Sequence, residues 1–190
     1  MASPPSPIET DRLRLVPWSD VYADQFADLC ADSEAMRFIS RGRPLPQATV
    51  DEILRRTREM WEQYGFGPWA ALEKGSSRWV GRIGLNLLHD WPSADKLEVG
   101  FELVPDAWGQ GYATEGARRT IGFAWEETPL RRIISATVPD HLASRRVMEK
   151  SGMTFQGEVA FRGTTVVWYA IDRPTSPMAR CRVRKREPNT

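Results

Sequence analysis

The sequence predicts a single α/β (α+β) domain in which about seven strands and about four helices share one core. Its length of 190 residues suits one domain, and 41% hydrophobic with 27% charged residues is typical of a globular chain. Segments that alternate apolar and polar residues predict strands, and apolar residues three and four positions apart predict helices. Three strand-like segments follow one another without a helix between them, which indicates an antiparallel meander.

The first half of the chain predicts one strand, two helices and then the meander. In order, these are a strand over 12–18, helices over 20–31 and 47–64, and strands over 68–73, 79–88 and 96–104. A polar, proline-containing segment at 40–46 separates the two helices and is a candidate loop over an active site.

The second half alternates helices and strands. The predicted elements are a helix over 112–126, a strand over 131–138, a helix over 141–151 and a hairpin of strands over 153–160 and 164–171. Asp140 is a candidate cap for the last helix, and Gly152 supplies its left-handed stop. We expect a flexible leader at 1–7, the domain at 8–173 and a disordered tail at 174–190.

Charge is distributed unevenly along the chain. Five basic residues against Glu187 give residues 174–190 a formal charge of +4, so the remainder carries −3 of the total of +1. A nearly neutral body lacks the broad basic surface of a dedicated nucleic-acid binder. The tail is either a solvated end or a weak contact for RNA or the ribosome.

No apolar run reaches transmembrane length, and the proline-rich start lacks the apolar centre of a secretory signal. Cys30 and Cys181 lie far apart without neighbouring His or Cys, which predicts neither a disulfide framework nor a metal site. We therefore expect a cytoplasmic protein with no membrane partner and no metal.

The segment LEVGFELVPDAWGQGYATE at 97–115 is the most informative, because a strand passes through a glycine-containing turn directly into a helix. Strand alternation places Glu98, Gly100 and Glu102 on one face. Gly109 and Gly111 allow close approach of a ligand, and the unpaired amides of a helix start suit phosphate oxygens. An ordinary strand, turn and surface helix remains the alternative, because short glycine patterns are weak motifs.

Three stretches, TDRLRLVPW, VGFELVPDAWGQGYATEGA and SRRVMEKSGM, together with the element order, resemble the GNAT superfamily of acyl-CoA-dependent N-acyltransferases. The similarity is to the branch that acetylates ribosomal-protein amino termini. It implies a GNAT-like domain with a central mixed, mostly antiparallel sheet. It also implies transfer of an acetyl group from acetyl-CoA to a primary amine, on either a protein N-terminus or a small molecule.

The resemblance also implies the cofactor site. The backbone amides of 109–114 would hold the diphosphate of acetyl-CoA, and a main-chain amide near Val104 would bond the thioester carbonyl. Trp108 stands where the family motif has Gln or Arg, and His141 replaces an Asn that precedes Ser144. The implied cofactor-binding residues are Leu103, Val104, Trp108, Gly109, Gln110, Gly111, Tyr112, Ala113, Thr114, His141 and Ser144.

Acyl transfer to an amine requires removal of an ammonium proton, stabilisation of an oxyanion and protonation of a thiolate. Glu98 and Glu102 are the candidate bases, with Glu98 favoured by the resemblance. Ser144 is a candidate proton donor to the sulfur or a contact to the pantetheine arm. Because no carboxylate is placed to orient His141, we expect direct transfer in a ternary complex rather than an acyl-enzyme.

The sequence leaves two rival interpretations. Gly109, Gly111 and Gly116 could belong to a Rossmann dinucleotide site, although the third glycine is misplaced and a meander precedes the turn. A non-catalytic module that binds acyl-CoA is the other alternative. The amine, the acyl chain length and the choice between monomer and homodimer stay open. Trp61, Tyr64, Phe66 and Trp91 are candidates to wall the amine pocket, or core residues.

Overall fold

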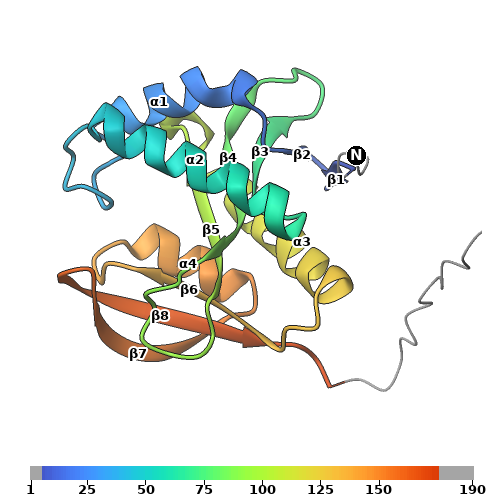
Figure 1. The fold of residues 1–190 in the computed structure, drawn as a ribbon, viewed down its shortest axis with the longest axis vertical. Helices are drawn as coiled ribbons and strands as arrows, with labels where there is room; N and C mark the ends of the chain where they lie inside the picture. Colours follow the sequence, from blue (N-terminus) through green and yellow to red (C-terminus); the bar gives the residue numbers. More distant parts are fainter. Residues whose placement is uncertain (1–5, 176–190) are drawn as a thin grey trace, which may run out of the picture.

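The computed structural model describes residues 6–175, and in that part of the chain eight strands form one sheet (Figure 1). The strands are β1 (Ile8–Glu9), β2 (Leu13–Pro17), β3 (Pro68–Glu73), β4 (Trp79–Leu87), β5 (Leu97–Leu103), β6 (Arg132–Thr137), β7 (Thr154–Phe161) and β8 (Thr164–Asp172). The α-helices of the same region are α1 (Ala23–Ala31), α2 (Gln47–Tyr64), α3 (Tyr112–Glu127) and α4 (Leu142–Lys150). Two short 3-10 turns, η1 (Asp20–Tyr22) and η2 (Pro105–Ala107), complete the order.

The predicted fold class is confirmed, with one strand more than expected. The extra strand, β1, has two residues and pairs with β2, and so short a segment carries no periodicity to detect. The predicted cap of α4 is wrong: His141, not Asp140, occupies the N-cap position, and no side chain caps that helix. Gly152 follows α4 with φ of 88°, as expected for a left-handed stop.

The order of strands is β1-β2-β3-β4-β5-β6-β8-β7. Each neighbouring pair of strands within residues 6–175 is antiparallel except β5 and β6, which are parallel. Strands β4 and β5 pair continuously from Gly81↔Leu103 to Leu87↔Leu97, whereas β5 and β6 meet at the single pair Glu98↔Ile134. Beyond that pair, β5 and β6 separate toward their carboxyl ends and leave the sheet open.

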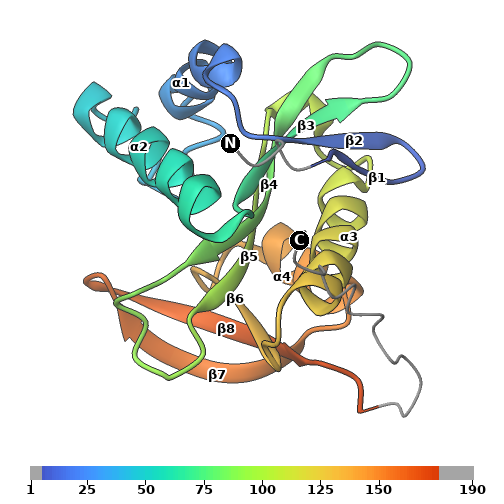
Figure 2. The same ribbon diagram turned by 45° about the vertical axis from the view of Figure 1, so that its right-hand side comes forward.

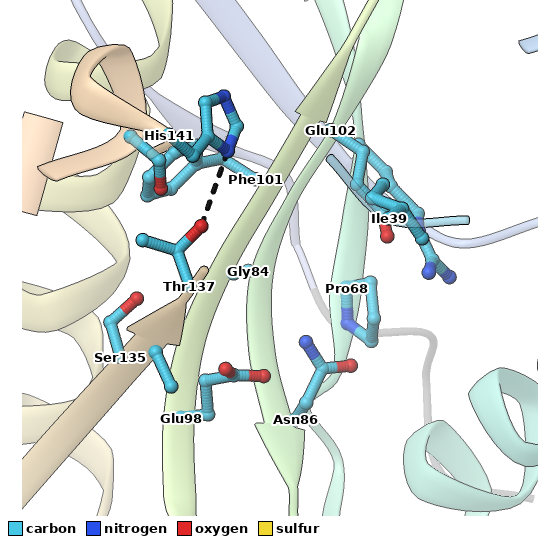
Figure 3. A pocket seen from close by; sticks show the side chains of 14 residues that line it. Ile39, Pro68, Gly84, Asn86, Glu98, Phe101, Glu102, Ser135, Thr137 and His141 are labelled. Atoms are coloured by element: carbon cyan, nitrogen blue, oxygen red, sulfur yellow. Dashed lines mark hydrogen bonds and ion pairs between the residues drawn. The ribbon is translucent and has the colours of Figure 1, made fainter. Parts of the chain in front are cut away.

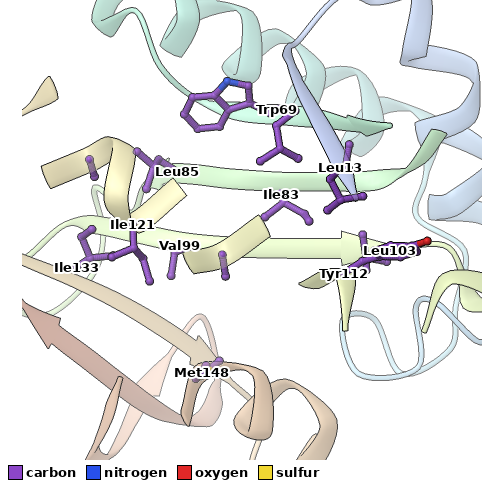
Figure 4. Packing of buried hydrophobic residues seen from close by; sticks show 14 of the residues in the cluster. Leu13, Trp69, Ile83, Leu85, Val99, Leu103, Tyr112, Ile121, Ile133 and Met148 are labelled. Atoms are coloured by element: carbon purple, nitrogen blue, oxygen red, sulfur yellow. The ribbon is translucent and has the colours of Figure 1, made fainter. Parts of the chain in front are cut away.

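Helices cover both faces of the first half of the sheet. Figure 2 shows α1 and α2 on one side of β3 to β5 and α3 on the other side. The main core lies under α3 and α4 and includes Ile83, Val99, Ile121 and Met148 (Figure 4). A second core under α1 and α2 includes Phe26 and Leu54.

Gly116 shows why α3 can lie so close to the sheet. A Cβ at this position would be 2.4 Å from the Ile83 Cδ1 atom, so a larger residue would push the helix away. Its role is helix packing. Together with the antiparallel meander β3-β4-β5, this rules out the Rossmann interpretation.

Most of the predicted leader and tail falls outside the described part of the chain. Residues 1–5 and 176–190 lie outside the described residues, and so does the proposed RNA contact of the basic tail. Within residues 6–175, no helix is long and apolar enough to cross a membrane.

Candidate active site

Two adjoining cavities occupy the opening between β5 and β6. The first, which we call the turn cavity, has a volume of about 340 Å³ and adjoins the segment 108–114. The second, the strand cavity, has a volume of about 170 Å³ and lies over β4, β5 and β6. Both cavities are lined by Ile39, Phe101, Glu102, His141 and Ser144, so they join at these side chains.

The turn before α3 presents backbone amides to the turn cavity. Gly109 and Gly111 have φ of 72° and 86°, and Gly111 is the N-cap of α3. The first helical bond runs from the Glu115 amide to the Gly111 carbonyl, at 3.0 Å. The backbone amides that precede Glu115 in the first turn of α3 therefore have no partner within the helix and can donate hydrogen bonds to an anion. A Cβ at Gly109 would meet nothing within 4 Å, which leaves the approach open.

A charged network from the segment between β1 and β2 holds this turn in place. Arg12 Nη1 donates to the Gln110 carbonyl at 2.8 Å, and Arg12 Nη2 lies 2.6 Å from Glu115 Oε2. Thr10 Oγ1 also donates to Glu115 Oε1, at 2.6 Å. The Arg12 guanidinium lies 4.7 Å from the centre of the Tyr112 ring. The segment between β1 and β2 thus fixes the turn by side-chain contacts distant in sequence.

The end of β5 shows which main-chain amide near Val104 faces the opening. The Val104 amide donates to the Val80 carbonyl at 3.1 Å and is therefore already used. Because residues in an antiparallel pair alternate in bonding direction, the Leu103 amide points away from β4, toward the opening. The Leu103 carbonyl accepts a bond of 2.8 Å from the Trp108 indole, which anchors Trp108 beside the turn.

The wall of the strand cavity is an array of facing residues on β4 and β5. The cross-strand pairs are Arg82↔Glu102, Gly84↔Gly100 and Asn86↔Glu98. Figure 3 shows the side chains of Glu98 and Asn86 turned toward each other across the neighbouring strands. Ser135 and Thr137 of β6 form the opposite side.

Glu98 has an electrostatic environment suited to proton transfer. The residue keeps some exposure toward the cavity, but the surrounding protein removes water from its carboxylate. This desolvation, helped by the negative charge of Glu102, raises the pKa of Glu98 to about 7. A bond from the Ala136 backbone opposes the shift. Near neutral pH, Glu98 can therefore both accept and release a proton.

Glu102 is in a different state, because it is ion-paired with Arg82. Arg82 is buried, its guanidinium lies 4.2 Å from the centre of the Phe26 ring, and its Nη1 is 3.4 Å from Thr57 Oγ1. A buried cation requires a counter-charge, which Glu102 supplies. Of the two predicted bases, Glu102 thus has a salt bridge, and Glu98 has none within residues 6–175.

His141 forms the boundary between the cavities. Its ring stacks on Phe38 at 4.1 Å. Figure 3 shows the contact of its Nδ1 with Thr137 Oγ1, at 3.2 Å. Burial lowers the pKa of His141, which favours the neutral ring. Ser144 is buried one turn into α4 and lines both cavities. The contact of Phe38 with His141 comes from the segment before the predicted loop 40–46, not from the loop itself.

Most sequence-predicted site residues come together here. Val104 and Gln110 are the exceptions, since neither lines a cavity, and the Gln110 side chain instead donates to the Asp106 carbonyl at 2.8 Å. None of the four aromatic candidates Trp61, Tyr64, Phe66 and Trp91 lines the strand cavity, which favours the other of the two interpretations left open by the sequence, that they pack in the core. Trp61 and Trp91 pack in the protein interior, against Trp69 and Phe161 respectively.

Sequence reasoning missed Arg82 and Asn86, although a signal was present. In the apolar strand 79–88, Arg82, Gly84 and Asn86 recur every second residue and so share one face. Among residues 6–175 the structure contains no group of three or more His, Cys, Asp or Glu that could hold a metal ion.

A family model of the acetyltransferase (GNAT) domain matches residues 12–154. The chain belongs to the GNAT acetyltransferase family. The resemblance to the GNAT superfamily drawn from the sequence is thereby confirmed, and the protein is an acetyl-CoA-dependent N-acetyltransferase with acetyl-CoA as its cosubstrate.

Known relatives of this GNAT chain cover nearly its whole length. The FsC-acetyl coenzyme A-N(2)-transacetylase of Aspergillus fumigatus is 29% identical over 201 residues, 91% of this chain and 82% of the relative. An acetyltransferase structure from Agrobacterium tumefaciens matches with a TM-score of 0.78 at 21% identity, covering 91% and 98% of the two chains. RimL, the ribosomal L7/L12 α-N-protein acetyltransferase in complex with coenzyme A, matches with a TM-score of 0.69 at 15% identity, covering 88% and 98%. The two solved structures show the same fold.

Proposed function

We propose that this enzyme transfers an acetyl group from acetyl-CoA to a primary amine directly, within a ternary complex. One observation carries the proposal: the turn cavity and the strand cavity join at Glu102, His141 and Ser144, beside Glu98. A donor in the first cavity and an amine in the second would meet at that junction. Proximity of this kind replaces a bimolecular collision by a reaction between bound partners.

The turn cavity fits acetyl-CoA by the chemistry of its lining. The amides between Gly109 and Thr114 would hold the diphosphate, and Arg146 and Lys150 add positive charge to the same cavity. The Leu103 amide, directed toward the opening, would donate to the thioester carbonyl and stabilise negative charge on that oxygen. Acetyl-CoA supplies the activated acyl group when bound.

The strand cavity would hold the amine next to its base. Glu98 would take the proton of the attacking ammonium, because its pKa of about 7 lies close to that of an α-amino group, about 8. Asn86, facing Glu98, would accept a second hydrogen bond from the amine. Ser144 at the junction would either donate a proton to the departing sulfur or contact the pantetheine arm.

The residues around the junction support direct transfer over an acyl-enzyme. His141 Nδ1 is bonded to a threonine hydroxyl rather than to a carboxylate, so no carboxylate stabilises its ring as a base for Ser144. Burial raises the pKa of the Cys30 thiol to about 11, which leaves it a poor nucleophile.

Acceptors of two classes are compatible with this site, a protein N-terminus and a small-molecule amine. The test is incubation with acetyl-CoA and a panel of peptides and small amines, with detection of released thiol and of the product mass. Thiol release that depends on an amine supports the proposal. Binding of acetyl-CoA without amine-dependent release across the panel would contradict it and favour a non-catalytic module.

A further inference from the structure

We propose, on the basis of the function above, that the acceptor is a primary amine whose adjacent carbon bears no ionised carboxylate. The acceptor would thus be an amine next to an ester or an amide, or a plain alkylamine, and free α-amino acids would be rejected. The charges and the dimensions of the strand cavity both support this specificity.

The charged side chains lining the strand cavity in the described part of the chain are Arg82, Glu98 and Glu102. Arg82 and Glu102 neutralise one another, and Arg82 is further held by the Phe26 ring and Thr57. The charge left to face a ligand is that of Glu98, which is negative when ionised. An ammonium group is attracted to this cavity, and a carboxylate is repelled from it.

A further cation that influences Glu98, outside the lining of the cavity, is also paired with a carboxylate. Arg162, in the turn between β7 and β8, is close enough to influence Glu98 electrostatically. Both of its terminal contacts go to Asp90, with Nε and Nη2 each 2.8 Å from a carboxylate oxygen. Because both of these donors of Arg162 are bonded to Asp90, its guanidinium does not serve as a binding site for a substrate carboxylate.

The carboxylate of an α-amino acid lies on the carbon next to its amine, so it cannot lie far from Glu98 when that amine is bound there. A volume of about 170 Å³ is below the ~300–1,000 Å³ of pockets for drug-sized ligands, so it holds the reacting end of a substrate. A Cβ at Gly100 would lie 2.9 Å from Asn86 Nδ2 and 3.8 Å from Glu98 Oε2. Asn86 and Glu98 therefore crowd the cavity beside Gly100, and a substituent on the carbon next to an amine bound here lies in the field of Glu98.

The experiment compares kcat/KM at pH 8 for three compounds with the same carbon skeleton: L-phenylalanine, L-phenylalaninamide and L-phenylalaninol. The amino alcohol is decisive, because its amine is similarly basic to that of the amino acid but carries no charge on the adjacent carbon. We expect the alcohol and the amide to be preferred over the acid on the order of 100-fold. Equal use of acid and alcohol would overturn the inference, whereas failure of every amine in the wider panel would instead overturn the proposed function.

A variant pair tests the assigned cause. Glu102→Gln leaves Arg82 without its counter-charge, so a substrate carboxylate can take that place, and the preference for alcohol over acid should fall at least about tenfold. Glu102→Asp keeps the charge and should retain the preference. Circular dichroism and acetyl-CoA binding establish that both variants are folded. An unchanged preference in folded Glu102→Gln would overturn the role of the Arg82 pair.

Discussion

The turn cavity and the strand cavity recognise their ligands by different means. The turn cavity presents backbone amides held by glycine geometry, and a local stretch of sequence specifies them. The strand cavity presents side chains from β4, β5, β6 and the segment before α2, which meet only after the chain has folded. Recognition by backbone amides does not depend on the identity of the side chains, whereas recognition in the strand cavity does.

The largest effect should come from the acceptor side. Glu98→Gln removes the unpaired base and should lower turnover by about 100-fold or more, while acetyl-CoA affinity stays nearly unchanged. Steady-state kinetics and calorimetric titration with acetyl-CoA measure the two quantities separately. An equal loss of acetyl-CoA affinity would show that Glu98 also takes part in binding the donor, contrary to the separation of donor and acceptor between the two cavities.

The next effect tests the donor side. Gly109→Asp places a negative charge where phosphate oxygens need access and should weaken acetyl-CoA binding at least about tenfold, or ~1.4 kcal/mol. Gly65→Asp is a matched control, because Gly65 has the same φ of 72° and a Cβ there would also meet no atom within 4 Å, but it ends α2. Equal affinity in the two variants would remove the turn from the cofactor site. Gly111 is a less clean choice, since its Cβ would lie 3.3 Å from Arg12 Nη2.

Ser144 lies at the junction of the two cavities, and its role can be assigned by kinetics. Ser144→Ala should slow the chemical step in single-turnover assays if the hydroxyl protonates the sulfur. If the hydroxyl contacts the pantetheine arm, KM for acetyl-CoA should rise a few fold and the chemical step should stay unchanged. No change in either quantity would exclude both roles.

The smallest effect concerns stability. Because the pKa of Glu98 rises from 4.5 to about 7 on folding, ionisation above pH 7 opposes the folded state, and the protonated form below pH 4.5 does not. Glu98→Gln should therefore raise the thermal midpoint by a few degrees at pH 8 and leave it nearly unchanged at pH 4. Differential scanning calorimetry at the two pH values gives the comparison, and a lower midpoint at pH 8 would contradict a desolvated carboxylate.

The turn cavity and the strand cavity also differ in how much of each can be predicted from the sequence. The element order and the Trp108–Thr114 turn are predictable, because periodicity and glycine placement are local properties of the chain. The pairing Asn86↔Glu98 depends on the register of two strands, and the stacking of Phe38 on His141 depends on how distant segments pack. Neither is encoded in spacing along the chain. The choice of the Leu103 amide among the amides near Val104 likewise follows from register rather than from motif.

The central claim is that Glu98 is the base of the acceptor side, and the ratio of wild-type to Glu98→Gln kcat/KM as a function of pH tests it most directly. The wild type uses the ammonium form of the amine, whose proton Glu98 accepts, whereas Glu98→Gln has no base there and must use the free amine. We predict that the ratio is constant below pH 7 and falls about tenfold per pH unit above it, following the pKa of about 7 for Glu98. A ratio that does not change between pH 5 and 9 would mean that the proton is taken by another group.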